Sequence, residues 1–174
     1  MIRNAACSMI VILLAALAGA QGPKTGLTAA QQHQMFQRNR VMIQTLVDSS
    51  VEISAMSGDY LQRSRSYRKV IMKFENELTD AANGNDAGRI AEIGKHLNTV
   101  MRQGLAPSLQ AAVRQVGADG TGQKDLREIR DRSVELVEWL QDKAKNKWAD
   151  TPEVREVIES LERTKKELGA GVEP

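Results

Sequence analysis

Apolar residues recur at helical spacing along the chain, and this periodicity limits its possible folds more than any other feature. The clearest case is a series at intervals of seven, formed by Tyr60, Tyr67, Phe74 and Ala81. Heptad spacing places such residues on one face of an α-helix that packs against another helix. The segments on either side are also helical in period rather than alternating as strands do. The sequence therefore predicts an all-α protein.

Glycine and proline residues divide the chain into five predicted helices. These cover residues 29–56, 60–82, 87–116, 124–148 and 152–168. Asp59 and Asp86 stand where they can cap the second and third helices, and Pro152 suits the first position of the fifth. Pro107 lies inside the third helix, so we expect a kink or break near Gly104. The predicted architecture is an antiparallel helical bundle of four main helices, with a shorter C-terminal fifth helix packed on its side.

The N-terminus has the three parts of a secretory signal peptide. Arg3 precedes an apolar run, and Ala18-Gly19-Ala20 forms a small-x-small end. We therefore expect cleavage after Ala20 and export to the periplasm or the extracellular space. The alternative is an uncleaved segment that anchors the protein to a membrane.

The predicted domain organisation follows from these boundaries. Residues 1–20 form the signal peptide, residues 21–27 a flexible lead, residues 28–168 a single helical-bundle domain and residues 169–174 a disordered tail. A chain of this length suffices for one domain with its own core.

Cysteine usage and charge exclude several classes of function. Cys7 is the only cysteine and lies in the predicted signal peptide. The mature chain therefore lacks a disulfide, a cysteine nucleophile and the thiolates needed for covalent haem attachment. The 24 Lys and Arg residues nearly balance the 22 Asp and Glu residues. This balance does not predict a nucleic-acid partner.

His96 and Glu92 are the candidate metal ligands. Their E-x-x-x-H spacing offers two ligands on one helical face to a divalent ion. The stripe that contains Ile90 and Leu97 turns His96 outward or to the rim, where a surface pair with Glu92 is expected. A bundle haem requires a histidine on the last helices, and none follows His96. No cofactor is therefore predicted.

The catalytic motifs of hydrolases, metalloproteases and nucleotide-binding enzymes do not occur in the sequence. Most carboxylates stand at outward helical positions, spaced to form ion pairs. An enzyme needs polar groups that converge in a pocket. The sequence therefore predicts a non-enzymatic protein.

Trp139 and the apolar stripe of the fifth helix are the predicted partner-binding residues. The stripe consists of Val154, Ile158 and Leu161, and Trp139 lies at the flank of the preceding helix. Large aromatic residues at a rim are common anchors in protein interfaces. Covering of Trp139 by the fifth helix is the competing interpretation, and the favoured one. The expected partner is another envelope or secreted protein, or a second copy of this chain. The alternative is a small-ligand or metal-binding exported protein.

Two further features have competing interpretations. The basic run from Gln62 to Lys69 is expected to face the acidic side of the 124–148 helix, with contact to an anionic membrane as the alternative. Gly88, Gly94 and Gly104 lie inside a predicted helix, where glycine destabilises. We expect them to allow close approach of a neighbouring helix and to make room for an aromatic ring. The alternative is a small apolar cavity beside the rings.

Overall fold

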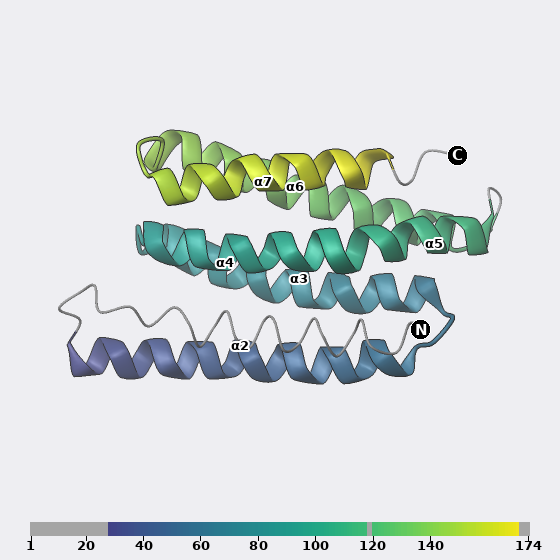
Figure 1. The fold of residues 1–174 in the computed structure, drawn as a ribbon, viewed down its shortest axis with the longest axis horizontal. Coiled ribbons are helices and arrows are strands. Elements are labelled where there is room, and N and C mark those ends of the chain that lie inside the picture. The colour runs from purple at the N-terminus through teal and green to yellow at the C-terminus, as the bar shows by residue number, and fades with distance from the viewer. Residues whose placement is uncertain (1–27, 118–119, 171–174) are drawn as a thin grey trace. The chain divides into compact units, whose positions relative to one another are not determined.

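The protein is all-α, as predicted. The computed structural model describes residues 28–117 and 120–170, and this part of the chain contains helices and short turns but no strand. The elements are α2 (Ala29–Ala55), α3 (Tyr60–Asn83), α4 (Ala87–Val100), the π-helix η1 (Met101–Leu105), α5 (Ala106–Val116), α6 (Gln123–Lys147) and α7 (Pro152–Ala170) (Figure 1). The predicted signal peptide and lead, and residues 171–174 of the predicted tail, lie outside the described residues.

The chain divides into two compact units, residues 1–55 and residues 56–174. In the first, α2 is a helix of 27 residues. The second, called here the C-terminal unit, contains α3 to α7 and η1. The single domain over residues 28–168 stays a prediction. Among the described residues, no helix combines the length and the apolar character that a membrane span requires.

Helix starts in the C-terminal unit follow the local sequence signals. The Asp59 side chain accepts a hydrogen bond from the backbone N–H of Gln62 at 3.0 Å, and Asp86 accepts one from that of Arg89 at 2.9 Å. These bonds satisfy N–H groups that have no partner within the helix. Helix α7 begins at Pro152, as predicted.

The C-terminal unit consists of two helical hairpins that lie side by side. One contains α3 with the long α4–η1–α5 helix, and the other contains α6 with α7 (Figure 1). Between the hairpins, Lys95 pairs with Glu156 and Arg102 with Glu167, so α4 and α7 run parallel. Arg65 near the start of α3 pairs with Asp125 near the start of α6. The uniformly antiparallel arrangement is therefore not confirmed, because neighbours in different hairpins run parallel.

A kink or break was predicted near Gly104. The chain does not break there but forms a π-helix, and the kink stays a prediction. The Ala106 backbone N–H donates to the carbonyl of Met101, five residues earlier, and both Leu105 and Ala106 keep helical dihedral angles. Pro107 removes one N–H from the helix and crowds the preceding turn. The wider π turn accommodates it, while the Ser108 hydroxyl donates to the Gly104 carbonyl at 2.8 Å. The chain therefore stays helical through this segment.

Two of the three helix glycines, Gly94 and Gly104, allow close packing as predicted. The prediction is wrong for Gly88, because a β-carbon there would lie 3.6 Å from its nearest neighbour, Oδ1 of Asp86. A β-carbon at Gly104 would lie 2.6 Å from Cζ of the Tyr67 ring, and one at Gly94 would overlap the Val157 side chain of α7. The space beside Gly104 is thus filled by an aromatic ring. Gly94 instead serves the approach of α7.

Helix α7 is a full member of the core rather than a peripheral helix. It contacts both α4 and α6, and it buries Val154, Val157, Leu161 and Leu168 together with the hydroxyl-bearing Thr164. The apolar stripe in the sequence predicted a narrower buried face for this helix than the structure has, because small and polar residues also face inward. Asn98 of α4 donates to Ser160 at 2.9 Å and accepts from Thr164 at 2.7 Å, which fixes α7 along α4.

Candidate functional site

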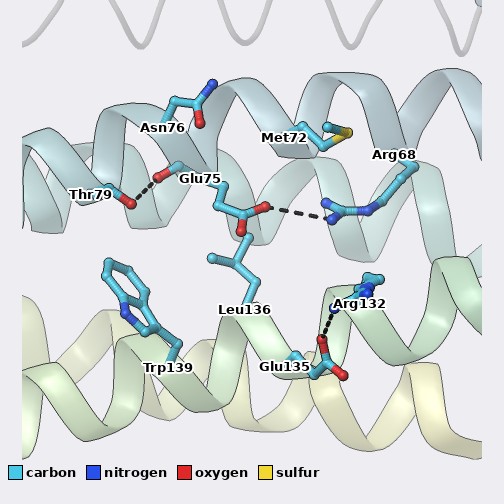
Figure 2. Close-up of a pocket in the computed structure, with 9 residues that line it drawn as sticks. All are labelled: Arg68, Met72, Glu75, Asn76, Thr79, Arg132, Glu135, Leu136 and Trp139. Carbon is cyan, nitrogen blue, oxygen red and sulfur yellow. Dashed lines mark hydrogen bonds and ion pairs between the residues drawn. The ribbon is translucent and has the colours of Figure 1, made fainter.

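A groove between α3 and α6 is the candidate binding site, and it is called here the α3–α6 groove. It has a volume of about 430 Å³. Its lining consists of Arg68, Met72, Glu75, Asn76 and Thr79 from α3 with Arg132, Glu135, Leu136 and Trp139 from α6 (Figure 2). All of these residues belong to the C-terminal unit.

Helical spacing explains why these side chains meet. The α3 residues recur at intervals of three and four, so they form one stripe on the surface of that helix. The α6 residues do the same. Because α3 and α6 run parallel, the two stripes keep the same order along the groove. Arg68 and Arg132 lie towards one end, and Thr79 and Trp139 lie towards the other (Figure 2).

The apolar part of the groove is formed by three side chains. Leu136 is buried and forms the base, whereas Trp139 is half-buried. Met72 has 51 % of its surface exposed and is one of few large apolar residues so exposed in the described chain. Polarizable methionine and aromatic rings adapt well to the side chains of a partner. The groove therefore offers an accessible apolar surface beside an aromatic ring.

The charged part of the groove contains two ion pairs. Arg68 pairs with Glu75 at 3.5 Å, and Arg132 pairs with Glu135 at 3.0 Å. Both members of the second pair are 60 % exposed, whereas the Arg68 side chain is only 17 % exposed. Nη1 of Arg68 is buried and has no hydrogen-bond partner within the described chain. The groove therefore holds a guanidinium group whose donors are incompletely used.

The predicted partner-binding residues divide between core and surface. Trp139 is half-buried and lines the α3–α6 groove. Val154 and Leu161 are buried within the C-terminal unit, and Ile158 is half-buried. The two buried residues hold α7 in place and offer no surface to a partner in this conformation. Sequence reasoning missed Met72 and Arg68 as neighbours of Trp139.

His96 is buried, which corrects its predicted outward position. Its side chain is only 8 % exposed. Arg89 lies on the same face of α4, is equally buried and pairs with Glu77 of α3 at 3.3 Å. Because α4 contacts both α3 and α7, its buried surface is wider than one apolar stripe. Burial lowers the pKa of His96 below its usual value of 6.5, Glu92 opposes this shift and Arg89 adds to it.

Glu92 forms an ion pair with a residue other than His96. Its carboxylate accepts from Nη1 of Arg89 at 2.8 Å. In the described part of the chain, no group of three or more His, Cys, Asp or Glu residues is arranged to hold a metal ion. Glu92 and His96 thus belong to a charged cluster with Arg89 and Glu77, and the metal site proposed from their spacing stays untested.

The basic run of α3 forms an ion pair with α6 through Arg65. Arg65 pairs with Asp125 of α6, which is not one of the acidic residues expected to face this run, namely Glu128, Asp131, Glu135, Glu138 and Asp142. Arg68 instead pairs within α3, with Glu75. The two arginines therefore form ion pairs with different helices, and Arg68 lines the groove.

Comparison with known proteins assigns no family to the chain. No protein-family model matches it, and searches of curated proteins and of solved structures gave no match.

Proposed function

We propose that this chain is an exported, non-enzymatic helical protein that acts by binding another envelope or secreted protein, or its own copy, through the α3–α6 groove. The observation that carries the proposal is the exposed Met72 beside the half-buried Trp139. Tryptophan and arginine are enriched among residues that dominate binding energy, and methionine is enriched in interfaces. Export is inferred from the signal-peptide pattern of the N-terminus.

The groove also suits binding by its construction. Its base is rigid, because Leu136 is packed in the core, while Met72 and Arg132 are accessible on opposite walls. Apolar contacts at the centre with polar groups at the rim are typical of protein interfaces. The lining residues come from two helices of the same rigid unit, so a partner meets a preformed surface.

Site-specific photocrosslinking tests this proposal. A benzophenone amino acid is placed at position 72 or 139, and the chain is expressed in its native host. The matched control carries the same group at Arg127, an exposed α6 residue outside the groove. We expect both groove positions to give one discrete protein adduct that position 127 does not give. Mass spectrometry then identifies the adduct as another protein or a second copy.

Two results would contradict the proposal. One is the absence of any adduct from positions 72 and 139, and the other is an identical adduct pattern from all three positions. The groove volume also falls within the range of small-molecule sites, about 300–1,000 Å³. Native mass spectrometry of the exported chain therefore accompanies the experiment. A stoichiometric bound mass that disappears in Trp139→Ala, without crosslinking, favours the small-ligand alternative instead.

A further inference from the structure

We infer that the α3–α6 groove recognises a protein segment that presents an acidic side chain and a large apolar side chain, the acid against Arg68 and Arg132 and the apolar residue against Trp139. This inference rests on the proposed function, because it specifies the chemistry of the partner.

The charge distribution along α3 favours an acidic partner group. Between Gln62 and Lys73, α3 carries five basic residues and no acidic one. This segment includes Arg68 at the charged end of the groove, and Arg132 faces the same end from α6 (Figure 2). Charge complementarity of this kind orients a partner and accelerates its association.

The acids already present do not saturate the two guanidinium groups. Each arginine has five N–H donors. Arg68 uses one contact of 3.5 Å to Glu75, and Nη1 of Arg68 is shielded from water without an acceptor. Nη1 of Arg68 is out of reach of a partner, so a partner carboxylate would bind chiefly the accessible Arg132, whose side chain is 60 % exposed.

The pairs that occupy the groove are also easy to exchange. Glu75 is 43 % exposed and Glu135 is 60 % exposed. Exposed ion pairs contribute little to stability. Both glutamates are free to turn into water when a partner carboxylate approaches. Arg68 remains in place because its side chain is only 17 % exposed.

The length of the groove sets the spacing of the two partner groups. Arg132 and Trp139 are seven residues apart on α6, or roughly 10 Å at about 1.5 Å per residue. An extended segment covers that distance in about three residues at about 3.3 Å each. A helical segment covers it in about seven. The acidic and apolar residues of the partner should stand at one of these two spacings.

Phage display with a random dodecapeptide library, selected on the immobilised chain, tests this inference. We expect the enriched peptides to share an acidic residue and a Leu, Phe or Trp at one of the two spacings. Arg132→Glu should lower the affinity for a synthetic enriched peptide about tenfold or more, because a charge-assisted contact is lost. Arg127→Glu makes the same charge change outside the groove and should leave binding unchanged.

Met72→Glu and Trp139→Ala test the apolar contact. Met72 is exposed, so its replacement should reduce binding without changing the urea midpoint of unfolding. Trp139 is half-buried, so Trp139→Ala can also change stability. Its effect on binding is therefore compared with its effect on the urea midpoint.

Three results would overturn the inference. They are peptides that lack acidic residues, binding that Arg132→Glu does not weaken, and the failure of any peptide to enrich. Co-sedimentation with phosphatidylglycerol vesicles in place of peptide binding would also overturn it, because the basic run of α3 would then face a membrane. Crosslinking from positions 72 and 139 to a protein partner would still support the proposed function, so the two failures can be distinguished.

Discussion

Gly104 of η1 packs against the ring of Tyr67 in α3, with no room between them for a methyl group. A β-carbon at position 104 would lie 2.6 Å from Cζ of the ring. Gly104→Ala should therefore lower the free energy of unfolding by about 1–3 kcal/mol, the usual cost of overpacking a core. Urea denaturation followed by circular dichroism measures the change.

The matched control for that variant is Gly88→Ala in α4. Its nearest neighbour would be Oδ1 of Asp86 at 3.6 Å, which is an ordinary contact. The free energy of unfolding of this variant should rise by about 0.4–1 kcal/mol, because alanine restricts the unfolded chain more than glycine does. Equal effects at both positions would contradict the close packing described for Gly104.

Arg89 links α3 to α4 through its two carboxylate partners. Arg89→Met keeps much of the side-chain volume but leaves Glu77 and Glu92 without their cation. We expect the free energy of unfolding to fall by about 2 kcal/mol. This is less than for a fully buried pair, because both carboxylates retain contact with water. The pKa of His96 should also rise, because Arg89 helps to keep it low. NMR titration of the His96 ring measures this rise, and an unchanged pKa would show that Arg89 does not act on the ring.

His96 makes the stability of the protein depend on pH. Burial lowers its pKa in the folded chain below 6.5, so the unfolded chain takes up a proton first as the pH falls. The folded state is then disfavoured, and stability should decrease as the pH drops below about 6.5. His96→Gln should remove this part of the pH dependence.

The check compares the free energy of unfolding of the two proteins between about pH 8 and pH 5.5, a window set by the ordinary histidine pKa. Carboxylate titrations are common to both proteins and cancel in the difference. Parallel pH profiles for the two proteins would contradict the prediction.

Thr164 and Asn98 hold α7 in register with α4. Thr164 is fully buried and its hydroxyl donates to Oδ1 of Asn98 at 2.7 Å. Thr164→Val keeps the shape but leaves that oxygen without its donor, which should cost about 1–2 kcal/mol. Thr99→Val is the control, because the Thr99 hydroxyl bonds only to its own helix, at the carbonyl of Lys95. A cost at position 99 equal to that at position 164 would argue against a role in register.

Local signals were sufficient to predict most helix ends. Asp59, Asp86 and Pro152 act on residues within one turn, and the helices begin where these residues place them. The π-helix was predicted only as a disturbance at Pro107, since the sequence does not indicate whether a helix breaks or widens. The close packing at Gly104 was predictable because a helix interior seldom retains glycine without a packing reason.

Features that depend on two helices far apart in sequence were not predictable in the same way. The burial of His96 requires a second neighbour of α4, which a single apolar stripe does not reveal. The groove requires the parallel contact of α3 with α6, which sets Met72 and Arg68 opposite Trp139 and Arg132. Trp139 was singled out from sequence as an aromatic residue at the flank of its helix, but its neighbours follow only from the packing of the hairpins.

The π-helix η1 lies within one continuous helical segment, α4–η1–α5, whose two halves contact different sets of helices. Before it, α4 contacts α3 and α7, and after it, α5 contacts chiefly α3 and α6. A π turn is one residue longer than the α turn it replaces, and each residue turns a helix by about 100°. The surfaces before and after η1 are therefore out of phase with a regular helix. A homologous chain with an unbroken α-helix here would be one residue shorter between Val100 and Ala106, so this is the place where the length of the segment can change without loss of either contact surface.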